Sequence, residues 1–451
     1  MIISVALRHA GNSAAAVGLA AAIAAAAQDA APPLAATNAA PGEPWWNLHA
    51  ANTDVGQLHP SFPAQYSGPN SLSSRAESAE TVAVDVFAGL RLWEGAEMHL
   101  DGLAWQGFGL SHTFGIEAFP SAEAYKLGAR VGDFTLARAL IRQTINLGGQ
   151  PQDIADDALH LAGQQDRSRV VVTLGEISLL DIFDHNRYAS DPQSQFLNWA
   201  LVGNEAWDYP ATSLGYMTGL AAELCQPQWA LRCGFFQMPR EANGLAIDPA
   251  YLRAWGMVTE LERQFRLASH PGAVRLLVYA NRAHMGSYEE AVDSSIRPAN
   301  IVATQAYRYK YGVCLNLEQE VCKDVGLFAR LGWSDGHTQA WVYSDVDDSS
   351  SMGISLNGEL WRRTNDTFGL AGVVSAASRI HQQFLADGGT GILAGDGALN
   401  YGLEKALETY YNFQVWKSLH VTADYQFILD PAFNRARGPV SVVGGRIHWD
   451  F

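Results

Sequence analysis

Short segments in which apolar and polar residues alternate follow one another along most of the chain from residue 45 onward. In the segment 80–93 one series is Val82, Val84, Val86, Ala88, Leu90 and Leu92, and the opposite series includes Asp85, Phe87 and Arg91. Successive side chains of a β-strand point to opposite faces, so this pattern predicts a strand with one apolar and one polar face. The tight turn Glu94-Gly95 then leads into 96–106, which predicts a hairpin.

The alternation recurs in later segments. In 135–147 the apolar series is Ala137, Ala139, Ile141, Ile145 and Leu147, against Arg138, Arg142, Thr144 and Asn146. In 420–429 Val421, Ala423, Tyr425 and Phe427 oppose Thr422, Asp424, Gln426 and Ile428. In the last segment Val443, Ile447, Trp449 and Phe451 oppose Arg446, His448 and Asp450. Each pattern predicts a strand that separates an apolar environment from a polar one.

Counted in order, the chain predicts sixteen strands, at 46–58, 80–93, 96–106, 135–147, 168–177, 213–225, 229–236, 254–265, 273–282, 305–317, 325–333, 348–358, 366–376, 407–416, 420–429 and 439–451. Tight turns such as Pro227-Gln228 and Lys417-Ser418 alternate with long segments such as 107–134, 178–212 and 377–406. An even number of strands, joined alternately by tight turns and long connections, is typical of a transmembrane antiparallel β-barrel. In such barrels the short turns are periplasmic and the long loops lie outside. Sixteen strands leave room for an aqueous channel.

Two further observations separate a membrane barrel from a soluble sandwich, which also alternates. Charged residues stand in mid-strand on the polar faces, as a water-filled lumen requires, and aromatic residues gather near strand ends, as in interfacial girdles. Past residue 35 no apolar run reaches the roughly 18 residues that a transmembrane helix needs. These features predict an all-β membrane protein and exclude a polytopic helical one.

The amino-terminal segment predicts export. One arginine, Arg8, precedes an apolar Ala-rich stretch, and cleavage after Ala27 would follow the small-residue rule of signal peptidase. We therefore expect a signal peptide at 1–27, a flexible Ala/Pro-rich mature amino terminus at 28–44 and the barrel at 45–451.

Charge and cysteine content narrow the possible partners. The net charge of −16 argues against nucleic acid, which needs a basic face, and is compatible with a solvated acidic surface or a cation-leaning pore. The spacing of Cys225/Cys233 and Cys314/Cys322 leaves open two disulfides or free thiols. An acidic run at Asp345, Asp347 and Asp348 lacks the Gly and Glu positions of a calcium loop, and no His spacing fits a metal site. We expect no cofactor and no resident metal.

Several long segments, in order from about Trp46 to Phe451, resemble the carbohydrate-selective porins of the OprB type. They include WNLHAANTDVGQLHPSF, AGLRLWEGAE, GFGLSHTFGIEAFPSAEAYKLG, LLDIFDHNRYASDPQSQFLNWAL and ADYQFILDPAFNRARGPVSVVGGRIHWDF. The resemblance implies a sixteen-stranded barrel in the bacterial outer membrane, a channel narrowed by inward loops and charged side chains, and a preference for small neutral sugars. The terminal Phe451 resembles the aromatic residue by which the outer-membrane assembly machinery recognises barrels. The resemblance leaves open whether the protein is a monomer or a homo-oligomer.

A sugar channel needs hydrogen-bonding groups at its narrowest point, because sugar hydroxyls both donate and accept. The alternation places eight candidates toward the lumen: Asp85, Arg91, Asp101, Arg138, Arg142, Arg330, Asp424 and Arg446. Arg138 and Arg142 are the strongest pair, roughly 13 Å apart along one strand face. The long segment 178–212 is expected to fold inward as a constriction loop, bringing Asp181, Asp184, Asn186, Arg187 and Tyr188 near the narrowest point. For each of these residues, bracing of the wall or an ordinary loop role is the alternative.

Three other functions compete with a passive sugar porin. A general, weakly cation-selective porin would follow from the acidic composition. A barrel enzyme acting on lipids would need a Ser/His pair on the outer rim, and the sequence offers none that is convincing. A structural barrel plugged by 178–212 would not conduct at all.

Overall fold

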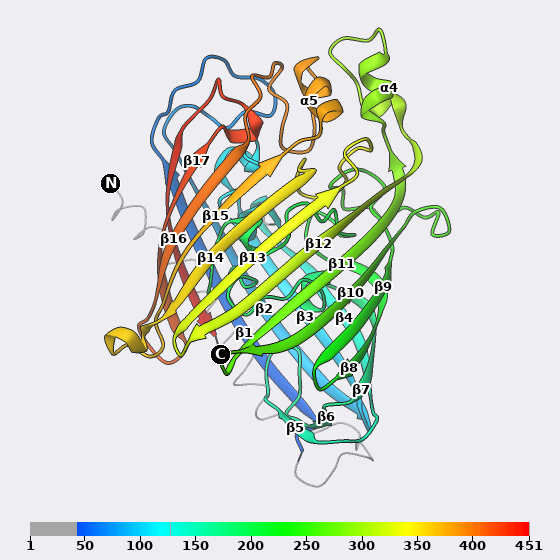
Figure 1. The fold of residues 1–451 in the computed structure, drawn as a ribbon, viewed down its shortest axis with the longest axis vertical. Coiled ribbons are helices and arrows are strands. Elements are labelled where there is room, and N and C mark those ends of the chain that lie inside the picture. Colours follow the sequence, from blue (N-terminus) through cyan, green and yellow to red (C-terminus); the bar gives the residue numbers. More distant parts are fainter. Residues whose placement is uncertain (1–42, 127, 451) are drawn as a thin grey trace.

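Sixteen antiparallel strands close into one barrel with strongly tilted strands (Figure 1). The computed structural model describes residues 43–126 and 128–450. The predicted signal peptide, residues 28–42 and Phe451 lie outside the described residues. The barrel strands are β1 (Trp46–His59), β2 (Glu77–Trp93), β3 (Ala96–Gly107), β4 (Ala129–Asn146), β7 (Arg169–Ile177), β8 (Met217–Gln226), β9 (Trp229–Phe236), β10 (Trp255–Leu267), β11 (His270–Met285), β12 (Ala306–Cys322), β13 (Val325–Ser334), β14 (Asp348–Asn357), β15 (Thr367–Ala376), β16 (Glu404–Gln414), β17 (Leu419–Leu429) and β18 (Val440–Asp450).

The remaining elements are short and lie in the connections. A separate two-stranded sheet is formed by β5 (Pro151–Ile154) and β6 (Gly163–Asp166). The α-helices are α2 (Ala122–Lys126), α3 (Trp199–Val202), α4 (Tyr288–Asp293) and α5 (Arg379–Ala386). The 3₁₀ turns are η1 (Leu110–Thr113), η2 (Leu179–Asp181), η3 (Val302–Thr304), η4 (Gly358–Trp361) and η5 (Pro431–Phe433). No helix among the described residues has the length and apolar character needed to cross a membrane.

The barrel closes where the first strand meets the last. β1 pairs with β18 from Ala51–Asp450 to Leu58–Val443, and its other edge pairs with β2 from Trp46–Leu90 to His59–Glu77. A sheet that closes on itself has no open edge, so its backbone groups are satisfied even in lipid. The sixteen predicted strands are confirmed. Their ends differ most at β4, which begins at Ala129 rather than 135, and at β12, which continues to Cys322 rather than 317. In both cases the ladder to the neighbouring strand continues beyond the alternating pattern.

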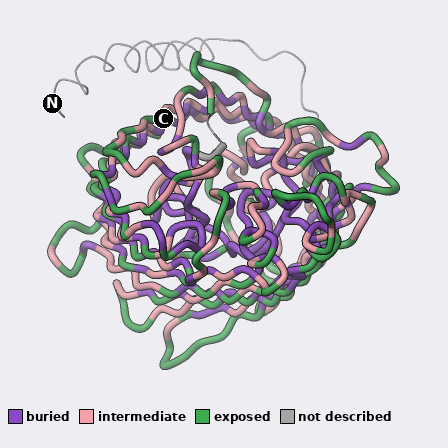
Figure 2. The backbone as a smooth tube through the Cα atoms, turned by 90° about the horizontal axis from the view of Figure 1, so that it is seen from above, coloured by how far each residue is buried: buried purple, intermediate pink, exposed green. Residues whose placement is uncertain are grey.

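The two faces of each strand separate as the alternation predicts. On β17, Val421 and Tyr425 are exposed on the outside, whereas Asp424 and Gln426 are buried on the inside. Seen along the barrel, buried positions gather in the centre of the ring (Figure 2). The lumen is therefore largely filled by chain.

One prediction about the faces is wrong. Ala137, expected on the apolar outer face with Ala139 and Ile141, is 1% exposed. The β3–β4 ladder shifts register there, with Asp101 opposite Arg138 and Gly102 opposite Leu136, so Ala137 is the extra residue of a β-bulge. Such a bulge exchanges the faces of the strand, and Phe134 and Leu136 are exposed on the side that precedes it.

The connection 178–216 between β7 and β8 lies inside the barrel, against the walls formed by strands far away in sequence. Glu408 of β16 accepts hydrogen bonds from the backbone amides of Leu197 and Asn198, at 2.6 and 2.9 Å. Arg446 of β18 donates to the carbonyls of Pro192 and Gln195. The loop is thus held by side chains that point inward from the opposite wall.

Arg330 of β13 makes the densest of these attachments. Its guanidinium donates to the carbonyls of Ala189, Leu201 and Val202 and pairs with Asp184, 3.2 Å away. The side chain is 1% exposed, so it anchors the loop and does not line open space.

Outer loops from other connections pack over this one. Glu404 accepts from the amides of Glu117 and Ala118, and Asp345 accepts from those of Ile392, Leu393 and Ala394. Asp347 pairs with Lys310 and His381. Asp345 and Asp347 of the acidic run are therefore buried acceptors, whereas Asp348 is exposed. The described residues hold no group of three metal-binding side chains.

The four cysteines are free. Cys225 is buried and Cys233 is exposed, and the β8–β9 ladder pairs them with Ala230 and Ala222. Cys314 is likewise buried and Cys322 exposed. Of the two alternatives left open by the spacing, the structure has the free thiols.

We expect Arg330→Leu to release the 178–216 loop, because it leaves Asp184 buried without its cation and several carbonyls without donors. Breaking a buried ion pair on one side costs about 3–5 kcal/mol. Limited trypsin digestion of the folded protein would then cleave within this loop faster than in the wild type. Arg263→Leu, at an exposed arginine that bonds to Gln228, is the matched control, and equal digestion of all three proteins would contradict the anchoring role.

Candidate constriction of the lumen

The bulge at Ala137 aims Arg138 at the inward loop. Its Nη1 donates to Asp101 Oδ2 at 2.6 Å, while Nε and Nη2 donate to the two carboxylate oxygens of Asp181 at 2.8 and 2.9 Å. The guanidinium also lies 5.1 Å from the centre of the Tyr216 ring. Arg138 is therefore fixed between the wall and the loop by two carboxylates, a geometry in which its planar fork is fully oriented.

A cavity of about 210 Å³ opens beside Arg138. Its charged lining among the described residues is Asp85, Glu123, Arg138, Asp181 and Asp191, and its aromatic lining is Phe87, Phe119, Trp199, Tyr209, Tyr216 and Tyr343. Pockets for drug-sized ligands measure about 300–1,000 Å³. This cavity therefore suits a smaller molecule, of the size of one sugar ring.

The aromatic rings form a connected group. Phe119 and Trp199 are stacked at 5.7 Å with an interplanar angle of 5°. Trp199 also contacts Tyr343 at 4.9 Å and Tyr209 at 5.9 Å. Trp199 comes from α3 of the inward loop, so this loop carries both rings and carboxylates to the cavity. Flat rings next to a guanidinium and carboxylates can contact the apolar face and the hydroxyls of a sugar at once.

A second cavity, of about 1140 Å³, lies toward the end of the barrel with the tight turns. Asp181 lines both cavities, so Arg138–Asp181 stands between them. The larger cavity is lined by Arg91 and Arg142. Both arginines donate to backbone carbonyls of the connection between β5 and β6, Arg91 to Ala162 and Arg142 to Leu159.

The structure thus divides the residues proposed from the sequence into three groups. Asp85, Asp101, Arg138 and Asp181 come together at the smaller cavity or against Arg138. Arg91 and Arg142 belong to the larger cavity. Arg330, Asp424 and Arg446 are buried under the inward loop. The distribution follows the path of the loop, because most of its attachments are to β10–β18, whereas both cavities are lined by residues of β2–β4.

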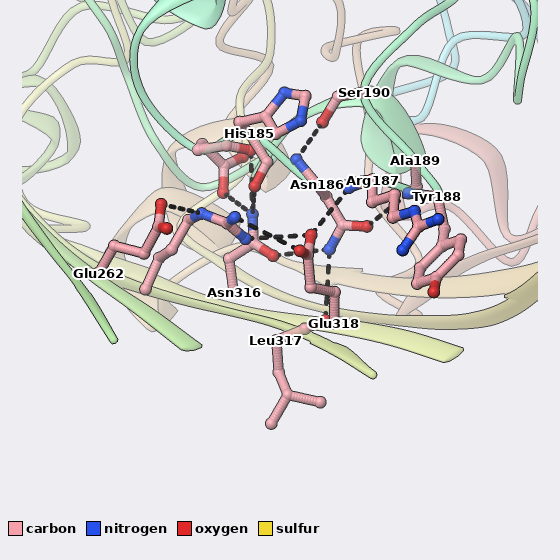
Figure 3. A network of polar contacts seen from close by, with 12 residues as sticks. His185, Asn186, Arg187, Tyr188, Ala189, Ser190, Glu262, Asn316, Leu317 and Glu318 are labelled. Carbon is pink, nitrogen blue, oxygen red and sulfur yellow. Dashed lines mark hydrogen bonds and ion pairs between the residues drawn. The ribbon is translucent and has the colours of Figure 1, made fainter. Parts of the chain in front are cut away.

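Most of the inward-loop residues that were expected near the narrowest point of the lumen instead contact the barrel wall. Asn186 donates to Asn316 Oδ1 at 2.7 Å and is 1% exposed (Figure 3). Asp184 accepts a hydrogen bond from Asn316 Nδ2 at 2.7 Å. The amide of Arg187 donates to Glu318, which also pairs with Arg275. The ring of Tyr188 occupies the place that a Cβ on Gly326 would take. Asp184, Asn186, Arg187 and Tyr188 are therefore placed at the loop–wall contact rather than at the smaller cavity.

Buried carboxyl groups accumulate where the outer loops meet. The side-chain hydroxyl of Ser375 donates to Glu205, whose burial raises its pKa from 4.5 to about 8. Burial, together with the negative charges of Asp345 and Glu404, also holds the pKa of Glu117 well above its usual range. At neutral pH these groups favour the protonated form.

Several residues at the constriction were not predicted from the sequence. Phe87 stood out on the polar face of 80–93, and an apolar ring at a lumen position is itself a signal. Phe119, Tyr209, Tyr216 and Tyr343 lie in loops, and Glu123 lies in the short helix α2. In none of these segments does a strand alternation indicate a direction. Their meeting depends on the path of three different connections.

The closed barrel, its inward loop and its charged constriction define an outer-membrane diffusion channel. The family model described as "Carbohydrate-selective porin, OprB family" matches residues 70–451. The chain belongs to this family and is a porin for carbohydrates in the bacterial outer membrane. A porin is not an enzyme, so the family also sets aside the lipid-acting alternative.

Among solved structures, the high-pH structure of Pseudomonas putida OprB shares the fold, with a TM-score of 0.67, 17% sequence identity, and coverage of 90% of this chain and 94% of that chain. The channel DcaP of Acinetobacter baumannii has a TM-score of 0.49 at 9% identity, with 93% of this chain and 100% of that chain covered. No curated protein is similar enough in sequence to be matched.

The buried Glu205 predicts a pH-dependent stability. Because its pKa is about 8 in the folded protein and 4.5 in its ordinary state, the folded protein holds a proton that the unfolded chain releases between these values. Its contribution to stability is therefore full below about pH 4.5 and is lost as the pH rises to about 8, by at most about 1.4 kcal/mol per pH unit.

Glu205→Gln removes this titration while keeping an acceptor for Ser375. We expect the thermal unfolding midpoint of the variant, measured in detergent, to fall less than that of the wild type across this pH range. Glu289→Gln, at an exposed residue of α4, should behave as the wild type. Parallel curves for all three proteins would contradict the buried, protonated state of Glu205.

Proposed function

We propose that this porin admits small neutral sugars of monosaccharide size, such as glucose, by passive diffusion past Arg138, Asp181 and the adjoining rings. The observation that supports this most is the cavity of about 210 Å³, in which Arg138, several carboxylates and the stacked Phe119 and Trp199 face one space. A sugar that enters can exchange its water for these polar groups while one face of its ring lies on an aromatic side chain.

The proposal assigns roles to the residues selected from the sequence. Asp85, Arg138 and Asp181 contact the solute, and Asp101 orients Arg138. Asp184, Asn186, Arg187, Tyr188, Arg330 and Arg446 hold the inward loop against the wall. Asp424 accepts a hydrogen bond from Gln426, which in turn accepts one from Asn198 of the loop. Arg91 and Arg142 act further along the path, in the larger cavity.

The mature chain and its surroundings complete the proposal. Under this proposal, residues 1–27 direct export and are removed, residues 28–44 are the Ala/Pro-rich mature amino terminus, and Phe451 serves recognition by the assembly machinery. The exposed apolar side chains on the outer faces, such as Val443 and Ile447, contact outer-membrane lipid. Association into a homo-oligomer is compatible with these faces.

Liposome swelling with the refolded mature protein tests the proposal. Glucose should enter faster than zwitterionic amino acids of similar size, and Arg138→Ala should reduce this preference roughly ten-fold, the effect of losing about 1.4 kcal/mol of selective interaction. Arg142→Ala, on the same strand but away from the smaller cavity, is the matched control and should keep the preference. Equal entry of all solutes into wild-type liposomes would contradict the sugar preference and indicate a general porin. No entry of any solute would contradict a conducting channel and indicate a plugged barrel.

A general porin with a preference for cations is the second candidate function. The lining of the smaller cavity favours the cation preference. Asp85, Glu123, Asp181 and Asp191 face Arg138 there. An excess of one charge at the narrowest point selects small ions of opposite sign. We expect the reversal potential across a salt gradient to show a preference for potassium over chloride, and Asp191→Asn to weaken it. A preference for chloride would contradict this charge assignment.

A further inference from the structure

The connection between β4 and β7 stands apart from the other links at its end of the barrel. Neighbouring links there are tight turns, such as Pro227-Gln228 between β8 and β9. Residues 147–168 instead carry the β5–β6 hairpin, which Figure 1 shows at the lower end of the barrel. The alternation predicts no strand between residues 148 and 167. We name residues 147–168 the exit hairpin.

The tip of the exit hairpin is attached to side chains that face the lumen from β1. Asn47 Nδ2 donates to Asp156 Oδ1 at 2.9 Å and to the carbonyls of Asp157 and His160 at 2.9 and 3.0 Å. His49 Nε2 lies 3.1 Å from Asp156 Oδ2. These contacts bring the tip from the rim to the inner wall of the barrel.

The next strands of the wall add further attachments. Arg91 of β2 donates to the carbonyl of Ala162 at 2.9 Å, and Arg142 of β4 to that of Leu159 at 2.6 Å. Leu161 is 2% exposed and supplies an apolar contact. Side chains from β1, β2 and β4 therefore hold the tip by hydrogen bonds, to its backbone at Asp157, Leu159, His160 and Ala162 and to the side chain of Asp156.

The exit hairpin forms one side of the larger cavity. Its residues in the lining are Ile154, Leu159, His160, Leu161, Gly163, Gln164 and Gln165. The same cavity reaches Asp181, and with it the smaller cavity at Arg138. A solute that leaves Arg138–Asp181 toward the turn end enters a space that this hairpin narrows.

We propose that the exit hairpin is a second filter of the channel, which limits the size of solutes at the periplasmic mouth while the Arg138 constriction selects their chemistry. This inference rests on the proposed function, because it needs a conducting path. The two narrow places act in series, so each limits flux by its own width. Arg91 and Arg142 position the filter, and Gln164 and His160 line it.

Deleting the hairpin tests the filter directly. Asn146 and Arg169 are partners in the β4–β7 ladder, so an Asn-Gly turn can replace residues 147–168 without stretching either strand. Single-channel conductance should rise roughly two-fold if the hairpin limits the exit, and oligosaccharides should enter liposomes faster than they do through the wild type. The preference for glucose over amino acids should persist.

A point variant covers the case in which the deletion prevents folding. Gln164→Trp adds bulk to the larger cavity and should lower conductance, whereas Gln152→Trp, on the neighbouring strand and outside the described lining, should not. Conductance and oligosaccharide entry that match the wild type in the folded deletion, or equal effects of the two Trp variants, would overturn the filter. These outcomes can be distinguished from a failure of the proposed function. If the proposed function is wrong, the wild-type protein itself shows no preference for sugar over amino acids.

Discussion

Every backbone amide and carbonyl inside a membrane barrel needs a hydrogen-bonding partner, and this requirement shapes the whole molecule. The wall meets it by closing β1 onto β18. The irregular loop 178–216 cannot meet it alone, so Glu408, Arg330 and Arg446 supply acceptors and donors from the opposite wall. Charged residues on the inner faces are thus needed to build the lumen before they can select what passes through it.

The regular part of this design is visible in the sequence because a strand repeats its chemistry at every second residue. The hairpin at 80–106 and the alternation of 420–429 therefore predicted both the elements and their faces. The bulge at Ala137 shows the limit. One extra residue moves all the side chains on one side of the bulge to the opposite face of the strand. Nothing in the local sequence pattern indicates which residue is the extra one.

The site was less predictable, for a reason that Arg138 and Arg330 illustrate. Both stand on the polar face of a strand, and the sequence gives them the same role. Arg138 faces a cavity with Asp181, whereas Arg330 is covered by carbonyls of the same loop. What separates them is the path of the loop across the lumen, set by contacts between residues far apart in sequence, such as Arg330 with Asp184. The rings of Phe119, Tyr209 and Tyr343 depend on the same path.

The state of Arg138 also explains how a charged constriction can serve a neutral solute. A guanidinium has five N–H donors, and three of those on Arg138 are already committed to Asp101 and Asp181. Its charge is balanced by these carboxylates, so under the proposed function the remaining donors would offer a sugar hydroxyl a modest hydrogen bond instead of a strong charged one. Conduction needs this compromise, since binding has to be strong enough to admit the solute and weak enough to release it. Under the same proposal, the two carboxylates would do more than hold the arginine in place, because they would also set how weakly it binds the solute.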